Sequence, residues 1–285
     1  MGKEKLILNL QKRKLIVYRV YSQLIKGIKD KSILKIVKPI AEQKLKDYKL
    51  LKSITKKEVK PNQLLIYYYL LASQLFGISF SLKLMERSES KCVGYVSRVV
   101  KSNEVYNLEK ACSKYEKQLE KVTDVRIKYA GAIVLGLNDA LVELTGALAG
   151  LTLALQNTKL VAVTGLITGF AASLSMAASG YLSSREYHQS KDGINPLTAA
   201  FYTGIAYIIT VLLLVMPYFI FMNHFAALSI MLILALGIIC SYTYYISIAK
   251  NLRFWHRFNE MAVISLTVAV ISFGVGWVLK KVVGI

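Results

Sequence analysis

The chain has 285 residues, of which 54% are hydrophobic, and it carries a formal net charge of +20. Such hydrophobicity and positive charge rarely occur together in one soluble domain, which excludes a uniform globular protein. The charge is uneven: residues 1–128 contain 29 Lys and Arg against 12 Asp and Glu, a net charge of +17, whereas residues 129–285 carry only +3. We therefore expect a basic N-terminal region followed by a membrane region.

Helical periodicity predicts four helices in the N-terminal region. We expect them at residues 6–28, 32–54, 62–100 and 105–121, with a break in the third near Ser88. Residues 64–84 are apolar enough to suggest a membrane span. Their tyrosines, serines and glutamine fit a buried helix of a soluble bundle better. The four segments predict a four-helix bundle over residues 1–125.

Five apolar segments of membrane length follow, near residues 127–155, 159–184, 196–220, 224–249 and 258–283. The first hairpin is expected to turn at residues 156–159, and Pro217 is expected to kink or end the third segment. Small-residue pairs four residues apart, Gly146 with Gly150 and Gly165 with Gly169, predict close packing of the first two segments. The expected fold class is all-α, with a five-helix transmembrane domain over residues 126–285.

Loop charge predicts the orientation of these segments, because basic residues concentrate on the cytoplasmic side. The side of the N-terminal region also holds Arg185, Lys191, Lys250, Arg253 and Arg257. The opposite side holds Lys159, Lys280 and Lys281. We expect a multi-pass protein of the cell membrane, with the N-terminal bundle in the cytoplasm and the C-terminus outside. The three scattered cysteines show no metal-ligand spacing and no disulfide framework, and no secretory signal is visible.

The first apolar segment carries two carboxylates in its middle. Asp139 and Glu143 are four residues apart, so a helix places them on one face, about one turn from each other. A carboxylate at membrane depth is costly unless it is paired, so this pair indicates a functional site. Both carboxylates could instead only bind basic side chains or backbone donors of neighbouring helices. Against this, the later segments contain almost no cations at that depth.

Two motifs resemble the vacuolar iron transporter family. Residues 136–146 read GLNDALVELTG and residues 173–183 read SLSMAASGYLS. The resemblance extends over about residues 126–285, and the first motif is quite specific. It implies a membrane transporter, working as a homodimer, that moves Fe²⁺ or Mn²⁺ out of the cytoplasm in exchange for protons.

The resemblance also implies roles for individual residues. Asp139 and Glu143 would be metal ligands of the transport pathway and Met176 a thioether ligand, with Asn138 and Glu186 as accessory residues. Carboxylates suit Fe²⁺ and Mn²⁺, while a thioether disfavours Mg²⁺ and Ca²⁺. On its own, Met176 would be interpreted as a flexible core residue. The metal ions are substrates, and no permanently bound cofactor is expected.

The second motif departs from the family pattern at one position. Relatives often have Glu where this chain has Gly180, one turn after Met176. Glu186, at the cytoplasmic end of the second segment, could still help to receive metal. His188 and Asp192 follow in the same short loop and are weaker candidates.

The N-terminal region resembles the ferritin-like domain that precedes the transporter in some prokaryotic members of the family. Residues 40–50 (IAEQKLKDYKL) look like the second ferritin helix and residues 80–89 (FSLKLMERSE) like the third. A diiron site in such a bundle needs Glu from two helices and Glu-x-x-His from the other two.

The diiron positions are degenerate here, and they are represented by Lys44, Asp47, Glu86 and Glu89. The first helix has no carboxylate in its centre, and residues 112–119 contain no histidine. Lysines in place of carboxylates repel cations. We therefore expect a bundle that has lost its diiron centre and neither oxidises nor stores iron.

The role of this basic bundle stays open. It could lie against anionic headgroups, where each Lys or Arg contributes about 1 kcal/mol. It could instead serve in docking or dimerisation, or it could sense iron. The lysines are dispersed and no recognised module frames them, so nucleic acid is not expected as a partner.

Three classes of function fit the sequence. The first is the divalent-metal transporter, and the second is a membrane-tethered ferroxidase, which the missing ligands disfavour. The third is a transport-inactive scaffold or regulator, compatible with the degenerate bundle and with Gly180. Retention of Asp139, Glu143 and Met176 favours transport, because an inactive protein has no reason to keep costly buried charges. We expect no enzymatic activity.

Overall fold

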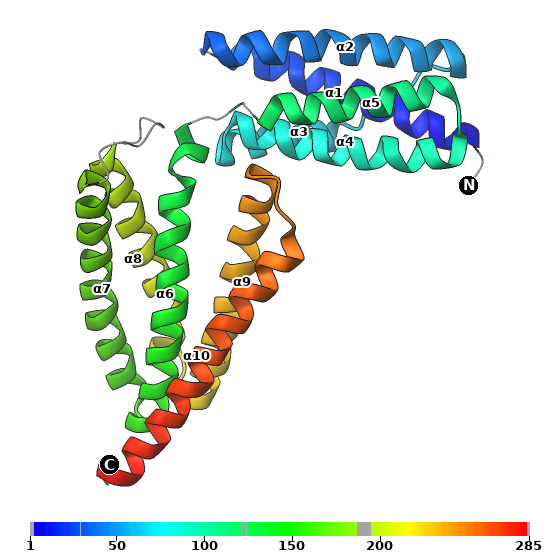
Figure 1. The fold of residues 1–285 in the computed structure, drawn as a ribbon. Coiled ribbons are helices and arrows are strands. Elements are labelled where there is room, and N and C mark those ends of the chain that lie inside the picture. The colour runs from blue at the N-terminus through cyan, green and yellow to red at the C-terminus, as the bar shows by residue number, and fades with distance from the viewer. Residues whose placement is uncertain (1–2, 29, 121, 123–124, 187–194, 284–285) are drawn as a thin grey trace. The chain divides into compact units, whose positions relative to one another are not determined.

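The computed structural model describes residues 3–28, 30–120, 122, 125–186 and 195–283. In these ranges the chain forms ten α-helices and no strand, which confirms the all-α fold class (Figure 1). It divides into two compact units. One contains Met1–Ile127 together with Ile248–Asn251, and the other contains Lys128–Ser247 and Leu252–Ile285.

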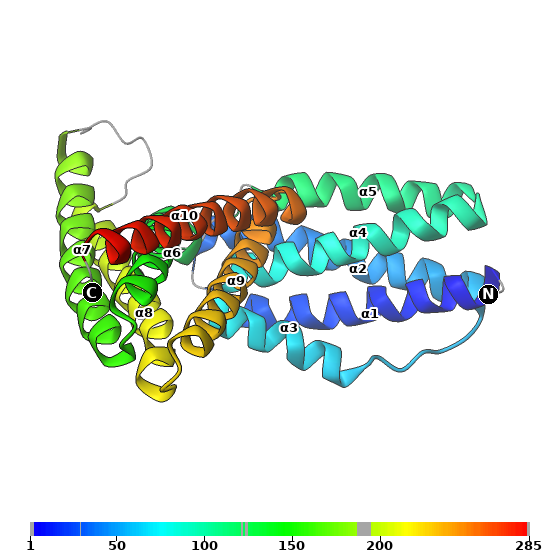
Figure 2. The ribbon, with the colours of Figure 1, turned by 90° about the horizontal axis from the view of Figure 1, so that it is seen from below.

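The N-terminal unit contains the first five helices. These are α1 (Lys3–Gly27), α2 (Lys31–Thr55), α3 (Gln63–Phe76), α4 (Ile78–Val100) and α5 (Asn103–Glu120). Contacts of α1 with α2, α2 with α5, α5 with α4 and α4 with α1 close a ring of four helices, which run side by side in Figure 2. The remaining helix, α3, packs on α1 and α4. Asp30 and Asn62 cap the starts of α2 and α3, since each side chain accepts a bond from a backbone amide two residues later.

The predicted third helix is broken at a different residue than expected. Helix α3 ends at Phe76 and helix α4 begins at Ile78, whereas Ser88 lies inside the continuous helix α4. Gly77 between them has φ 97° and ψ 158°, a conformation that a residue with a Cβ atom avoids and glycine adopts easily. The prediction of one long helix with a break near Ser88 was wrong, because the single glycine decides where the helix ends.

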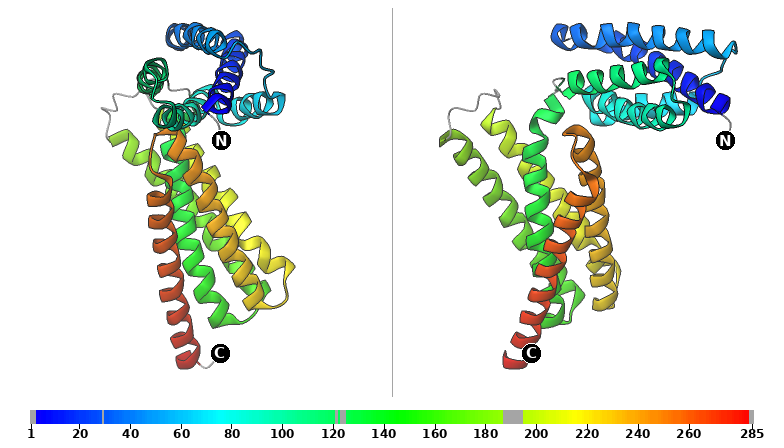
Figure 3. Two further views of the ribbon diagram at one scale, coloured as in Figure 1. Left: turned by 90° about the vertical axis from the view of Figure 1, so that its right-hand side faces the viewer. Right: turned by 45° about the vertical axis from the view of Figure 1, so that its right-hand side comes forward.

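The second unit contains five helices that are long and apolar enough to cross a membrane (Figure 3). They are α6 (Val125–Leu155), α7 (Thr158–Glu186), α8 (Pro196–Ile220), α9 (His224–Ala249) and α10 (Phe254–Val283). Their bounds agree with the five predicted segments to within a few residues. Gln156, with φ 49°, ends α6 at the predicted hairpin. Pro217 lies in the last turn of α8, three residues before that helix ends.

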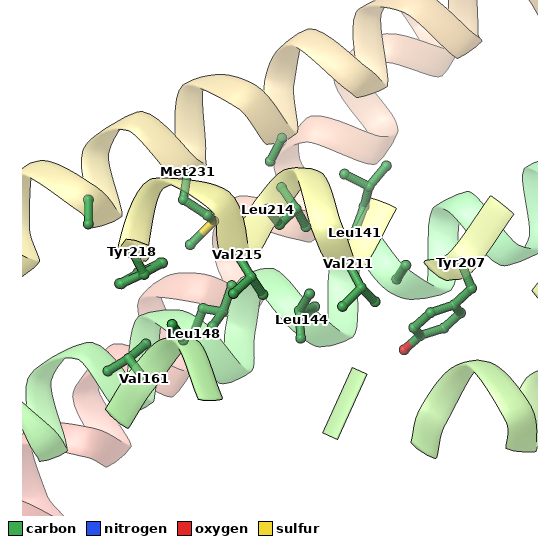
Figure 4. Packing of buried hydrophobic residues seen from close by; sticks show 14 of the residues in the cluster. Leu141, Leu144, Leu148, Val161, Tyr207, Val211, Leu214, Val215, Tyr218 and Met231 are labelled. Atoms are coloured by element: carbon green, nitrogen blue, oxygen red, sulfur yellow. The ribbon is translucent and has the colours of Figure 1, made fainter. Parts of the chain in front are cut away.

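An apolar core joins four of these helices. It contains Leu141, Leu144 and Leu148 of α6, with partners from α7, α8 and α9. Figure 4 shows Tyr207 at one end of this cluster and Val161 at the other.

Glycines set the closest helix approaches, though not only between the first two spans. A Cβ atom on Gly146 would lie 2.7 Å from Val268 Cγ1, and one on Gly150 would lie 2.9 Å from the Ser272 carbonyl oxygen. The first pair of glycines therefore faces α10. In α7, Gly165 faces Leu148 of α6, but Gly169 faces Val211 of α8. The prediction of close packing within the first hairpin holds for Gly165, while the remaining three glycines contact α8 or α10.

Candidate functional site

Helices α6 and α8 approach closely just before the two membrane carboxylates. A Cβ atom on Gly136 would lie 2.4 Å from the carbonyl oxygen of Thr203, so only glycine fits there. The Thr203 hydroxyl donates to the carbonyl oxygen of Ala132, at 3.0 Å, which also links the two helices. This contact positions the next turn of α8, where Tyr207 lies.

Glu143 accepts a hydrogen bond from Tyr207. The Tyr207 hydroxyl lies 2.6 Å from Glu143 Oε2. The ring of Tyr207 is buried in the apolar core, which holds the hydroxyl in place, while Glu143 itself is exposed in the single chain. Tyr207 is not among the residues predicted from the sequence. Nothing in the sequence singles it out, because only the crossing of α6 and α8 brings its hydroxyl to the carboxylate.

Asp139 and Asn138 lie one turn earlier on α6. Asp139 is half-buried and makes no hydrogen bond or ion pair with the residues that the structure describes. Oδ1 of Asn138 is buried and also has no hydrogen-bond partner among them. Buried polar groups are nearly always satisfied, so an acceptor left open beside a carboxylate indicates a place for a cation or a proton.

Met176 of α7 is half-buried and packs against the apolar core that contains Tyr207. Its neighbour Ala177 approaches α8 closely: a Cβ atom on Gly204 would lie 3.1 Å from the Ala177 Cβ. Gly204 is one turn before Tyr207, so Met176 belongs to the same layer of the unit as the Glu143–Tyr207 pair.

The accessory candidates of α7 are only partly described. Glu186 is the last residue of α7, but its side chain lies outside the described part, as do His188 and Asp192. A Cβ atom on Gly180 would meet nothing within 4 Å, so packing does not demand glycine there.

The described residues contain no group of three or more His, Cys, Asp or Glu able to hold one metal ion. Among the described residues of one chain, the candidate membrane site offers two carboxylates, the Tyr207 hydroxyl bonded to Glu143, and the open Asn138 Oδ1 beside Asp139 in the sequence. These are hard oxygen donors, the type that Mn²⁺ and Fe²⁺ accept.

The N-terminal unit contains a second polar site, a buried cluster of ion pairs inside the four-helix ring. The structure brings together all four residues of the predicted degenerate diiron site: Lys44, Asp47, Glu86 and Glu89. Lys44 Nζ lies 2.9 Å from Glu86 Oε2 and 2.8 Å from Glu89 Oε2. All these side chains are at most 3% exposed.

Three further members of this cluster are not predicted from the sequence. Lys14 Nζ of α1 lies 2.6 Å from Glu89 Oε1 and 2.8 Å from Asp47 Oδ2. The Tyr21 hydroxyl donates to Glu86 Oε1 at 2.9 Å, and Cys112 Sγ of α5 lies 3.4 Å from Lys14 Nζ. A signal existed for Lys14, which stands between Leu10 and Tyr21 on the apolar stripe of α1, where lysine is unusual unless it is paired.

Burial and facing charges together set the protonation of the cluster. Burial lowers the pKa of Lys14, but Glu89, Cys112 and Asp47 together outweigh burial, and the pKa is raised well above its usual value. Burial raises the pKa of Glu89, but the two lysine ammoniums lower it to about 2. The pKa of Glu86 is raised, because burial outweighs the attraction of Lys44. At neutral pH the chain therefore supplies, with its own ammoniums, the positive charge that metal ions would bring.

Comparison with known proteins supports the family resemblance. Residues 130–192, which include α7 and most of α6, match the family model described as VIT family. The match confirms the resemblance that the two motifs predicted, and its range contains Asp139, Glu143 and Met176. No curated protein sequence matches the chain. The ferritin-like resemblance of residues 1–125 lies outside the matched range and stays a prediction.

Proposed function

Because its first two membrane helices match the VIT family, a family of membrane metal-ion transporters, we propose that this multi-pass protein carries Fe²⁺ or Mn²⁺ across the bilayer. One observation supports this most directly. Asp139 and Glu143 share one face of an apolar helix and make no ion pair with any described residue. A pair of carboxylates without a resident cation suits a site that binds a passing one.

The membrane site is incomplete within one chain, which supports a homodimer. Glu143 is exposed in the isolated protomer although it lies mid-helix in an apolar span. Lipid is a poor environment for an ionised carboxylate, so this face needs a polar cover or a water-filled path. A second copy would supply the polar cover and would help to enclose a water-filled path. It would also bring another Asp139 and Glu143 to the site. Met176 would add a thioether that favours transition metals over Mg²⁺ and Ca²⁺.

Protons are the coupling ions in this proposal. Each carboxylate can hold either a metal ion or a proton, so exchange requires no additional group. The basic loops on the side of the N-terminal unit support a cytoplasmic N-terminus. Metal would then leave the cytoplasm while protons enter, and transport would strengthen as the external pH falls. The location is the cell membrane.

The N-terminal unit takes no part in redox chemistry in this proposal. Lys14 and Lys44 stand where a diiron centre would need ligands, and their ammoniums lie within 2.9 Å of the remaining carboxylates. An iron ion would have to displace one buried ammonium, and the other ammonium would still repel it. We therefore expect neither a diiron centre nor ferroxidase activity.

Metal uptake into proteoliposomes tests the transport proposal. Protein whose cytoplasmic side faces outward should accumulate Fe²⁺ or Mn²⁺ when the lumen is acidic. Asp139→Asn should abolish this uptake while the protein stays folded, because the neutral side chain cannot exchange a proton for metal. Glu260→Gln is the matched control, since it neutralises an exposed carboxylate that pairs with Arg257 at 3.3 Å. Unchanged uptake by Asp139→Asn would remove this residue from the pathway. Absence of uptake by well-folded wild type would refute transport and favour a scaffold role.

A further inference from the structure

Helix α3 presents an uncharged apolar face on the outside of the N-terminal unit. Leu64, Tyr67 and Leu71 are 79%, 69% and 54% exposed. Their spacing of three and four residues places them on one stripe, opposite the buried face formed by Ile66, Tyr69 and Ala72. Residues 61–82 contain no Asp, Glu, Lys or Arg.

This stripe is unusual for a surface in water. Single exposed apolar residues are common, but a continuous row of large ones marks an interaction surface. Because α3 packs on α1 and α4 from outside the four-helix ring, the ring does not cover its outer face.

The charge around α3 favours a negatively charged surface as its occupant. Lys56, Lys57 and Lys60, shortly before the helix, are all exposed, and of these Lys57 pairs with Glu4. The region 1–128 carries a net charge of +17, so a second copy would bring the same strong positive charge toward this face. Anionic headgroups attract such basic segments, whereas like-charged units repel.

The chain connection places a membrane within reach. Helix α5 ends at Glu120, and the first membrane span begins at Tyr129. The intervening residues can extend over at most roughly 30 Å. The N-terminal unit is therefore held permanently near the lipid surface, where even a weak lipid contact would be occupied.

We propose that α3 is an interfacial helix, whose Leu64–Tyr67–Leu71 face embeds in the headgroup layer of an anionic bilayer. The apolar face would enter the boundary of the acyl chains, as interfacial amphipathic helices do. Tyrosine suits the membrane–water interface, because its ring is apolar and its hydroxyl stays hydrated. The lysines before α3 would meet the lipid phosphates. This surface is separate from the transport site and does not depend on the transported metal.

Tryptophan quenching by brominated lipids tests this contact in the full chain. Trp255 and Trp277 are first replaced by Phe. A single Tyr→Trp substitution then provides the only tryptophan, whose emission reports on the surroundings of that position. Tyr67→Trp reports on α3. Tyr106→Trp on α5 is the matched control, because Tyr106 is similarly exposed, at 63%. Each variant is reconstituted in phosphatidylcholine with phosphatidylglycerol, with either plain or brominated acyl chains.

We expect brominated chains to reduce the emission of the Tyr67→Trp variant several-fold and to leave that of Tyr106→Trp unchanged. Adding Leu64→Asp and Leu71→Asp should abolish the quenching while the helical circular dichroism stays the same, since both side chains are exposed. Unquenched emission of Tyr67→Trp would overturn the proposal. If that emission were also blue-shifted, a second copy or another protein would cover the stripe instead.

Discussion

Glu89 and Glu143 are two carboxylates whose surroundings differ in charge. Glu89 lies between two ammoniums, at 2.6 Å and 2.8 Å, and is neutralised by its own chain. Among the described residues, Glu143 accepts a hydrogen bond only from the Tyr207 hydroxyl, which brings no charge. The first arrangement balances the carboxylate charge within the chain, whereas the second leaves it unbalanced, as the proposed transport site requires.

The Glu143–Tyr207 bond should support metal binding. Tyr207→Phe removes a hydrogen bond to a charged group, typically about 1.5–3 kcal/mol. We expect uptake at limiting metal to fall about ten- to hundredfold. Tyr218→Phe, on the same helix, removes a bond of 2.7 Å to Thr152 and should leave the metal dependence unchanged. Equal effects of the two substitutions would assign Tyr207 a packing role only.

The ion cluster should be sensitive to loss of one lysine. Lys44→Met leaves Glu86 and Glu89 buried with one ammonium fewer, which should lower the free energy of unfolding by about 3–5 kcal/mol. Denaturant titration of the full chain, followed by hydrogen exchange in α2 and α4, measures this loss. Lys52→Met, which removes an exposed pair with Glu58, should change little. A stable Lys44→Met variant would show that the cluster does not depend on charge balance.

At the level of elements, glycines allow the membrane helices to approach one another closely. Gly150 and Gly276 let α6 and α10 touch: a Cβ atom on Gly276 would lie 2.2 Å from the Gly150 carbonyl oxygen. The same principle brings α8 to α6 at Gly136. Because these contacts involve backbone, they cannot be relieved by moving a side chain.

Gly276→Ala should therefore separate α6 from α10. We expect a loss of stability of about 1–3 kcal/mol, the usual cost of overpacking. Gly274→Ala on the same helix is the control, since its Cβ atom would meet nothing within 4 Å. Thermal unfolding in detergent compares the two variants. A Gly276→Ala variant as stable as Gly274→Ala would mean that the two helices separate at no cost.

At the level of the whole molecule, the orientation of the spans would determine the direction of the proposed transport. The net charge of +17 in residues 1–128 should keep the N-terminus in the cytoplasm, and five spans should then place the C-terminus outside. Epitopes fused to each end test this in intact cells. Antibody should bind only the C-terminal epitope before the cells are opened. Binding to the N-terminal epitope would reverse the direction of the proposed transport.

The sequence by itself determined the helical class, the five spans and the carboxylate pair. These features depend on local composition, because a span needs length and apolarity, and the spacing of Asp139 and Glu143 alone puts them on one helix face. The ferritin-like resemblance also pointed to Lys44, Asp47, Glu86 and Glu89, which lie in one buried ion cluster, while the resemblance itself stays a prediction.

Tertiary structure alone decided which distant residues meet. Tyr207 reaches Glu143 across 64 positions of sequence, and Lys14 reaches Glu89 across 75. The partners of Gly146 and Gly150 came from the last span rather than from the next. Such contacts depend on how helices cross, and many sequences with the same periodicity could cross differently. The exposed stripe of α3 likewise depends on tertiary structure, because α3 lies outside the ring of four helices and its outer face stays uncovered by the ring.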